Sequence, residues 1–284
     1  MKQEASDAPT SARRLTWSLG LAVILCAACG SQPVAPQTSS DRMNKIIEQF
    51  ERDEPALAGE HWRIVSLEHN PFLVDDLEAF LQELAAEGAS RPRLTPVVRI
   101  AHEADQDIHH AVKEFLDAGA FGIVLPQVRT AEQVARFVRA MRYPPQRGAQ
   151  YPEPRGRRGW APGGALRLWG LASDDYARKA DVWPLNPEGE LLAIIMVETR
   201  ESVENIDEIF QVPGLGGALV GRADLSLSLG IGTPAANGTA PEVEAAIVTV
   251  GEACVRHNIL CGIYAQEDVE ERVEQGFRLF PVAP

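Results

Sequence analysis

The sequence predicts an α/β protein with parallel strands, best accommodated by one (β/α)8 TIM barrel over residues 41–284. Segments with helical spacing of apolar residues alternate with short apolar runs. The runs lack a polar face, as expected of parallel strands covered on both sides. Because this alternation repeats often within about 240 residues, it favours a barrel over an open sheet.

The predicted elements follow one another regularly. The expected helices share a helical period and cover residues 41–52, 74–88, 105–118, 130–142, 173–180, 201–210, 241–257 and 266–276. The expected strands are short and apolar and cover residues 64–65, 96–100, 122–126, 191–197, 217–221, 259–263 and 277–282. The predicted barrel is abbreviated at both ends. Only Pro55–His61 separates the opening helix from the first predicted strand, so the first βα unit is short. No eighth helix follows the last predicted strand.

The first forty residues are predicted to lie outside this fold. Arg13 and Arg14 precede the apolar run 15–28, which is too short to span a bilayer but suits a signal peptide over residues 1–28. Its CAAC ending resembles a bacterial lipobox in which Cys29 is lipidated, and residues 29–40 form a Pro/Ser/Gln-rich tether. We therefore expect a membrane-anchored lipoprotein facing the periplasm or cell exterior. The alternative is a cytoplasmic protein translated from Met43.

Composition narrows the classes of partner. The 284 residues carry 27 Lys+Arg against 40 Asp+Glu, a formal net charge of −13. This acidity argues against a nucleic-acid partner and limits membrane contact to the expected anchor. Small molecules are the expected partners. Cys254 and Cys261 remain in the barrel, where buried free thiols are expected in preference to a disulfide, and no spacing resembles a zinc site.

Four polar residues stand at the carboxyl ends of predicted strands, where barrel enzymes carry their catalytic groups. Glu198 ends the run LLAIIMV, Asp224 follows GALVG, Arg99 lies in PVVRI, and His69 closes IVSLEH. Glu198 and Asp224 come from successive strands and are expected to reach one ion. Two oxygen ligands suit Mg²⁺, Mn²⁺ or Co²⁺ with open positions for a 2-oxo acid. The alternative is that both carboxylates cap helices.

Three segments carry a resemblance to a known family: GIVLPQVRTAEQVARFVRAMRYPP, IIMVETRESVENIDEI and VPGLGGALVGRADLSLSLG. In this order they resemble the HpcH/HpaI aldolase family of phosphoenolpyruvate/pyruvate-type barrels, over residues 43–284. The resemblance implies a class II aldolase that reversibly cleaves 4-hydroxy-2-oxo acids to pyruvate, or a related 2-oxo acid, and an aldehyde. It also implies that Glu198 and Asp224 hold the metal, that Arg99 binds the carbonyl or enolate oxygen, and that His69 is the acid/base.

The chemistry agrees with these roles. Cleaving the C3–C4 bond leaves an enolate whose charge a divalent cation and a guanidinium can stabilise. An imidazole suits removal of the C4 hydroxyl proton. A Schiff-base route needs a strand-end lysine, and the four lysines of the chain all lie in signal or helix positions: Lys2, Lys45, Lys113 and Lys179.

The chain also departs from the family pattern. Ser66 stands where relatives have an Asp that orients the His, and Met196 stands where many have Gln. Relatives also exchange a terminal helix between subunits, so homo-oligomer assembly is an expectation that the missing helix weakens. These departures predict weakened activity and keep two alternatives open: a non-catalytic lipoprotein module that binds 2-oxo acids, and a citryl- or malyl-CoA-type lyase.

Other polar clusters have ordinary interpretations. His102, His109 and His110 are expected to be solvated rather than to bind metal. The long Pro/Gly/Arg-rich segment 143–187 is either a functional loop or a lid. In it, Arg155, Arg157 and Arg158 either clamp a substrate carboxylate or form an exposed basic loop. The aromatic residues Trp160, Trp169 and Trp183 are expected to hold this segment on the barrel.

Overall fold

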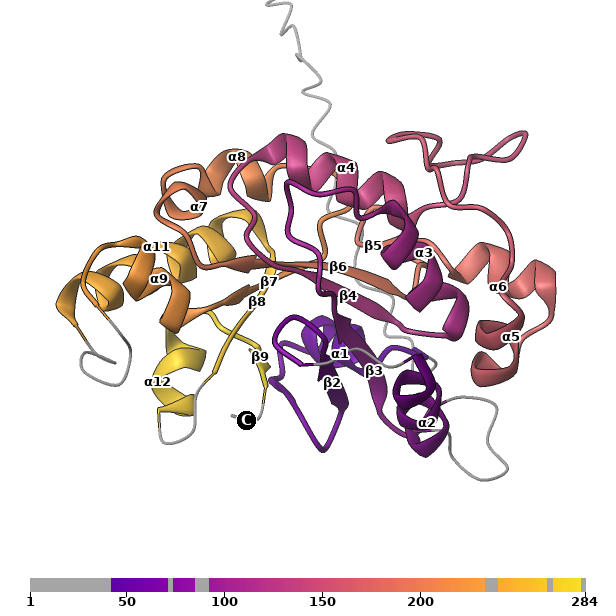
Figure 1. Ribbon diagram of the computed structural model, residues 1–284, viewed down its shortest axis with the longest axis horizontal. Helices are drawn as coiled ribbons and strands as arrows, with labels where there is room; N and C mark the ends of the chain where they lie inside the picture. The colour runs from indigo at the N-terminus through magenta and orange to yellow at the C-terminus, as the bar shows by residue number, and fades with distance from the viewer. Residues whose placement is uncertain (1–41, 71–73, 85–91, 233–239, 265–267, 282–284) are drawn as a thin grey trace, which may run out of the picture. The chain divides into compact units, whose positions relative to one another are not determined.

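The computed structural model describes residues 42–70, 74–84, 92–232, 240–264 and 268–281 (Figure 1). The predicted signal peptide, the tether and Cys29 lie outside the described residues. None of the helices in these ranges is both long and apolar enough to cross a membrane.

The predicted barrel is confirmed. Its strands are β1 (Ala56–Leu57), β2 (Trp62–Ser66), β3 (Thr95–Arg99), β4 (Gly122–Leu125), β6 (Leu191–Val197), β7 (Gly217–Val220), β8 (Leu260–Ile263) and β9 (Leu279–Phe280). They pair in parallel in the order β1-β9-β8-β7-β6-β4-β3-β2, and short β5 (Val182–Trp183) pairs with β6. The two ends of this order are linked by a single bridge between Ala58 and Trp62, so the ring is nearly closed. No helix separates β1 from β2, as the abbreviated first unit predicts.

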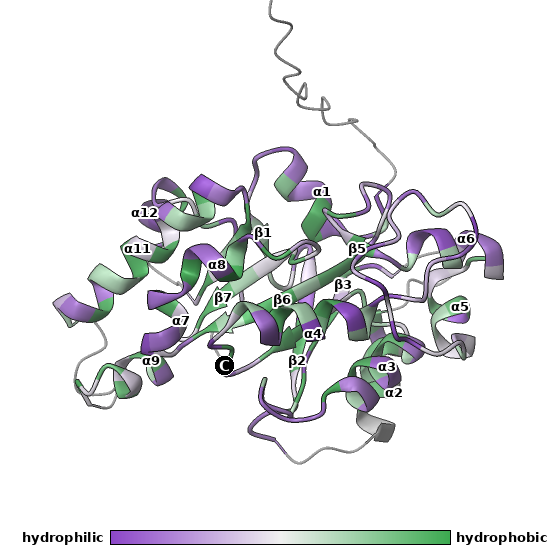
Figure 2. Cartoon of the chain, turned by 90° about the horizontal axis from the view of Figure 1, so that it is seen from above, coloured by the Kyte–Doolittle hydropathy of each residue, from purple (hydrophilic) through white to green (hydrophobic). Residues whose placement is uncertain are grey.

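Helices cover the outside of this ring. They are α1 (Lys45–Glu51), α2 (Val74–Leu84), α3 (His109–Ala118), α4 (Ala131–Met141), α5 (Gly163–Trp169), α6 (Ser173–Lys179), α7 (Arg200–Glu204), α8 (Ile206–Phe210), α9 (Arg222–Ser228), α11 (Pro241–His257) and α12 (Val269–Glu274). In Figure 1, α4, α8 and α11 lie along the β4, β6 and β7 region. Figure 2 shows hydrophobic residues along strands such as β6 and hydrophilic residues on outer helix turns such as α7, as expected of amphipathic helices on a parallel sheet.

Alternation along the strands separates two apolar layers. Val98, Ile123 and Ile195 belong to the larger core between strands and helices. Every second residue points the other way and joins a smaller core inside the ring, composed of Ile46, Ile47, Ala56, Trp62, Val97, Val124, Trp183, Leu192, Ile194, Met196, Leu219, Leu260 and Leu279. Helix α1 contributes Ile46 and Ile47, both fully buried, so it fills the amino-terminal end of the barrel.

A buried carboxylate joins the start of the domain to this end of the ring. Glu190 directly precedes β6 and is 1% exposed. Its Oε2 accepts the backbone N–H of Asn44 at 2.9 Å, and its Oε1 accepts that of Met43 at 3.3 Å. Arg42 pairs with Glu190 at 3.8 Å and with Glu51, and it donates to two backbone carbonyls. The folded domain therefore extends upstream of Met43.

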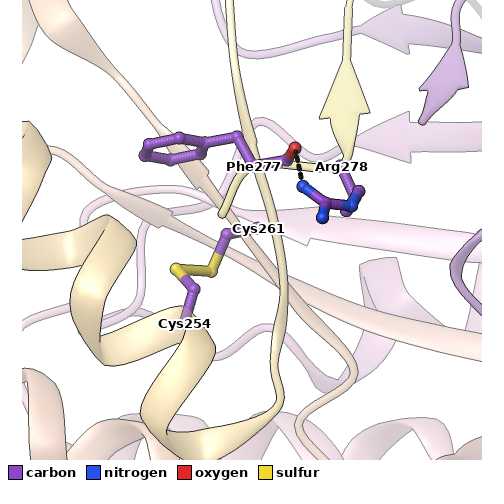
Figure 3. The surroundings of a disulfide bond; sticks show 4 residues. All are labelled: Cys254, Cys261, Phe277 and Arg278. Atoms are coloured by element: carbon purple, nitrogen blue, oxygen red, sulfur yellow. Dashed lines mark hydrogen bonds between the residues drawn. A yellow bond between two sulfur atoms is a disulfide. The ribbon is translucent and has the colours of Figure 1, made fainter. Parts of the chain in front are cut away.

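The expectation of free thiols at Cys254 and Cys261 is wrong, because the two form a disulfide (Figure 3). Helix α11 ends at His257, and Asn258 adopts the left-handed conformation with φ 52°. That residue reverses the chain so that β8 runs back beside the last turn of α11. The two Cα atoms are thereby 6.0 Å apart, within the range that a disulfide spans.

The long segment 143–187 packs on the outside of α3 and α4. The backbone N–H groups of Arg157 and Arg158 donate to the carbonyls of Arg139 and Arg142 at 2.8 and 2.9 Å. Arg158 is buried and pairs with Asp117 at 2.7 Å, so for this residue both alternatives, a clamp on substrate and part of an exposed basic loop, are wrong. Its neighbours Arg155 and Arg157 are exposed, as the alternative of a basic surface loop expected.

Two of the three tryptophans hold this segment as predicted. Trp169 is fully buried and stacks on Phe121 with ring centroids 3.9 Å apart. Trp183 is also buried and meets Phe50 of α1 edge-on. Trp160 contacts the Tyr143 ring but is 54% exposed.

Candidate active site

The mouth of the barrel is built from the inward-facing positions of its strands. On β6 the inward set Leu192, Ile194 and Met196 continues to Glu198. On β3 the inward residue Val97 is followed by Arg99. Because side chains alternate with period two, the same rule places Glu68 beyond β2 and Tyr264 beyond β8 on the inside. The carboxyl ends of these parallel strands therefore bring charged side chains together above the apolar interior.

Glu198 is 1% exposed and has one satisfied carboxylate oxygen. Its Oε1 accepts the backbone N–H of Gln127 at 2.7 Å, a residue held in the left-handed conformation with φ 56°. Its Oε2 is buried and has no hydrogen-bond partner among the described residues. Burial, together with the nearby charges of Glu68 and Asp224, raises the pKa of Glu198 to about 7 against the lowering effects of the Gln127 N–H and Arg99. Burying a carboxylate oxygen without a hydrogen bond destabilises the folded state unless a ligand or ion binds that oxygen.

Neither carboxylate of the predicted pair serves as a helix cap. The N-cap of α7 is Thr199, whose hydroxyl accepts the Ser202 N–H at 3.0 Å. Helix α9 begins after Gly221 without a side-chain cap, and Asp224 lies in its first turn. The structure therefore favours the site interpretation over the cap alternative for Glu198 and Asp224.

Gly221 allows the end of β7 to approach Glu198 closely. A Cβ at this position would lie 2.6 Å from Glu198 Oε2 and 2.9 Å from Glu198 Cβ. Asp224 follows within one helical turn, and its charge acts on both Glu198 and Glu68. The prediction that the Glu198 and Asp224 carboxylates belong to one site therefore agrees with the electrostatics of the mouth.

Arg99 is held by two residues of β2 and its extension. Ser66 lies opposite Arg99 in the strand register, and Ser66 Oγ accepts from Arg99 Nε at 2.8 Å. Glu68 Oε2 lies 2.9 Å from Arg99 Nη1. Burial raises the pKa of the Glu68 carboxyl, and Arg99 opposes that rise. Sequence reasoning missed Glu68, although its inward position, two residues after Ser66, would have indicated it.

His69 lies at the edge of the mouth. Its side chain is 64% exposed, and its Nε2 is 3.5 Å from Glu68 Oε2. Because inward positions on β2 are even-numbered, His69 follows the outward set, unlike Arg99 and Glu198, which belong to the inward sets of β3 and β6. The barrel does not enclose its imidazole.

Tyr264 is a second residue that the sequence analysis missed. It directly follows β8, and its backbone carbonyl accepts from the Arg222 guanidinium. Burial raises the pKa of its phenol, which also interacts with the charges of Arg99, Glu68 and Glu198. Its hydroxyl is therefore part of the same electrostatic cluster.

The donor set suits a hard divalent cation. Oxygen atoms dominate at the mouth, and among the described residues no donor meets Glu198 Oε2, on which the charge of Asp224 also acts. Among the described residues no group of three or more His, Cys, Asp or Glu side chains forms a ready-made metal cage. A cation here would therefore keep open positions for substrate oxygens.

The histidine-rich patch and a neighbouring cavity lie elsewhere. His102 and His110 are exposed as predicted, whereas His109 is partly buried. Burial lowers the pKa of His109, and Arg157 adds to this effect. A cavity of about 390 Å³ lies beside it, between the connection after β3 and α4, and contains none of the predicted site residues.

Fold and mouth together define the class of protein: a TIM barrel with carboxylates and an arginine at the carboxyl ends of its strands. The HpcH/HpaI aldolase/citrate lyase family matches residues 53–281. The chain therefore belongs to this family.

Individual relatives agree with this membership. The 2-keto-3-deoxy-L-rhamnonate aldolase of Klebsiella pneumoniae is 36% identical over 176 residues, which cover 62% of this chain and 56% of the relative. The protein of that name from Salmonella schwarzengrund is 35% identical over 202 residues, 70% of this chain and 63% of the relative. The chain thus spans less than two thirds of the length of these relatives.

Solved structures show the same fold. An HpcH/HpaI aldolase/citrate lyase family protein from Burkholderia cenocepacia superposes with a TM-score of 0.67 at 27% identity, covering 84% of this chain and 92% of the other. An HpcH/HpaI aldolase from Desulfitobacterium hafniense superposes with a TM-score of 0.65 at 22% identity, covering 83% and 89%.

Proposed function

We propose that the protein is a divalent-metal-dependent aldolase that reversibly cleaves 4-hydroxy-2-oxo acids to pyruvate, or a related 2-oxo acid, and an aldehyde. The observation that carries the proposal is the buried, unpartnered Oε2 of Glu198 beside Asp224. Relatives named as aldolases support the reaction class.

The four predicted site residues and Met196 each have a part in this reaction. Glu198 and Asp224 would hold the cation, whose chemistry is to stabilise negative charge on the oxygens of the 2-oxo acid. Arg99 donates N–H groups to the oxygen on which charge develops as the C3–C4 bond breaks. His69 accepts the proton of the C4 hydroxyl from the solvent side of the mouth. Met196, below Glu198 on β6, gives the pocket an apolar floor that excludes water.

Metal removal tests this proposal. EDTA should abolish release of pyruvate from a panel of 4-hydroxy-2-oxo acids, and Mg²⁺, Mn²⁺ or Co²⁺ should restore it. The measurement is pyruvate formation coupled to lactate dehydrogenase. Cleavage that survives EDTA, or that persists in Glu198→Ala, would contradict the proposal.

One observation favours a second candidate, a non-catalytic module that binds 2-oxo acids. His69 is 64% exposed, so the barrel does not enclose the imidazole that would accept the proton. Calorimetry with oxalate and Mg²⁺ separates the two. Metal-dependent binding without turnover across short and long aldehydes would select the module.

We also propose that the protein acts outside the cytoplasm and is anchored to the membrane through a lipid on Cys29. The Cys254–Cys261 disulfide supports this location, since such bonds persist in oxidising compartments. The buried pairing of Arg42 with Glu190 and Glu51 supports a start upstream of Met43. Mass spectrometry of the membrane fraction should find Cys29 acylated. An unmodified Cys29 would exclude the anchor.

A further inference from the structure

The mouth contains one buried acid to which neither the metal nor the proposed proton transfer assigns a role. Glu68 extends the inward set of β2, and its side chain is only 10% exposed. Its Oε2 is buried without a hydrogen-bond partner among the described residues, although two cationic or basic groups lie beside it. Burying a carboxylate oxygen without a hydrogen bond costs folding free energy, which indicates a functional role for Glu68.

The contacts of Glu68 converge on Arg99. Arg99 Nη1 lies 2.9 Å from Glu68 Oε2, and Arg99 Nε donates to Ser66 Oγ at 2.8 Å. These two contacts fix two of the three guanidinium nitrogens from the β2 side. Within the described part of the chain, Nη2 has no acceptor and stays available for a ligand. The same Glu68 oxygen lies 3.5 Å from His69 Nε2.

We infer that Glu68 is a positioning residue that sets the orientation of Arg99, and through the same oxygen restrains His69, for a 2-oxo acid bound in the mouth. This inference rests on the proposed function. Ser66 has no charge and holds only the Nε side of the guanidinium. Glu68 supplies a charged contact on the Nη1 side, and this ion pair adds an electrostatic restraint to the single hydrogen bond at Nε.

If Glu68 positions Arg99, loss of its charge should affect ligand binding and turnover differently. Glu68 carries negative charge and so opposes an incoming anion while it aligns Arg99. Without that charge, attraction between Arg99 and an anionic ligand is unchanged or stronger, but the guanidinium loses its alignment with the reacting oxygen. Misalignment of this kind costs on the order of 100-fold in rate. A merely structural role would instead weaken binding and turnover together.

The test uses Glu68→Gln in the full chain, with Glu103→Gln as the matched control. Glu103 also acts on the charge of Glu68, but it is exposed and follows the end of β3 by four residues. For Glu68→Gln we expect kcat to fall about 100-fold while the Kd of oxalate in the Mg²⁺-loaded protein stays within about threefold of wild type or tightens. Glu103→Gln should keep both values within about twofold. An unchanged kcat in Glu68→Gln, or parallel loss of kcat and oxalate binding, would overturn the inference.

Rescue and a spectroscopic readout complete the test. Adding Ser66→Asp to Glu68→Gln places a carboxylate beside Arg99 Nε and should recover at least tenfold of the lost kcat; no recovery would count against positioning.

In the metal-free protein, the side-chain Nε–Hε NMR signal of Arg99, assigned with Arg99→Lys, should be sharp in wild type and broadened by guanidinium rotation in Glu68→Gln. If Glu68→Gln does not fold, Glu68→Asp, which keeps the charge one methylene further away, should show a smaller kcat loss, and a wild-type kcat there would overturn the inference. Because the NMR signal needs neither metal nor turnover, an unchanged signal refutes the positioning role, whereas an inactive wild type that does not bind oxalate refutes the proposed function.

Discussion

Two buried glutamates flank β6, Glu190 just before it and Glu198 just after it, and both are 1% exposed. Burial raises the pKa of both carboxyls. Glu190 is surrounded by donors, namely two backbone N–H groups, Arg42 and Lys179. Glu198 has a single N–H donor, an orphaned oxygen and two carboxylates as neighbours.

The difference shows how one strand can carry a structural and a functional acid. At the amino-terminal end, every oxygen of Glu190 meets a protein donor, so the residue ties the start of the domain to the barrel. At the mouth, Glu198 is held in place by the Gln127 N–H, and its other oxygen has no donor among the described residues; there we propose that a cation binds. Equal burial therefore says little about role, whereas the set of partners separates the two.

The largest expected effect is on turnover at the Glu198 end. Glu198→Gln keeps the shape of the side chain and removes the charge that would hold a cation, so pyruvate release should fall by about 10³-fold or more. Its melting temperature should equal or exceed that of wild type, because an unpaired buried charge disappears. Coupled assays and thermal melts measure the two quantities. A Glu198→Gln protein that is active, or strongly destabilised, would erase the contrast with Glu190.

The converse effect is expected at the Glu190 end. Glu190→Gln removes the charge that Arg42 and Lys179 meet, and the free energy of unfolding should fall by about 2–3 kcal/mol. The kcat should stay within about twofold of wild type, since the mouth lies at the other end of β6. Urea denaturation and the same coupled assay provide the readouts. Loss of activity without loss of stability would show that the two ends are not independent.

A third expected effect, comparable in size to the second, is a pH dependence of stability to which Glu198 contributes. Its pKa is raised from an ordinary value of 4.5 to about 7, so between these pH values the folded metal-free protein keeps a proton that the unfolded chain has lost. Stability should therefore decrease as pH rises through this window, by at most about 3 kcal/mol, and level off above it. The decrease should be smaller in Glu198→Gln than in wild type, where the raised pKa values of Glu68 and Glu190 still contribute, and it should persist in Glu190→Gln. Denaturation at pH 5, 6 and 8 in EDTA measures it, and identical slopes in wild type and Glu198→Gln would contradict the raised pKa.

Local pattern was enough to predict most of the barrel. The boundaries of β6 and α11 agree with the predicted 191–197 and 241–257, because an unbroken apolar run and a long amphipathic helix leave little choice of register. Short elements were missed, among them β1, α5 and α9. Two-residue strands and single-turn helices are determined by tertiary pairing, which no local periodicity records.

Candidate site residues could be predicted from the sequence where their position at a strand end was enough to identify them, and only incompletely where it was not. Glu198 and Arg99 follow from their place at strand ends. Choosing His69 over Glu68 shows the weak point, since a one-residue difference exchanges the inner and outer faces of a strand. The Cys254–Cys261 bond depended on the reversal at Asn258, and the buried Arg158 on contact with Asp117, both of which exist only once the chain is folded.

Gly221 gives the mouth a simple vulnerability. A methyl group there would lie 2.6 Å from Glu198 Oε2, 2.9 Å from Glu198 Cβ and 3.0 Å from the end of Met196, so these side chains would have to shift. One added carbon would thus displace the oxygen that we propose holds the cation. A substitution at Gly221, a residue without a functional side chain, would therefore be enough to abolish the proposed activity.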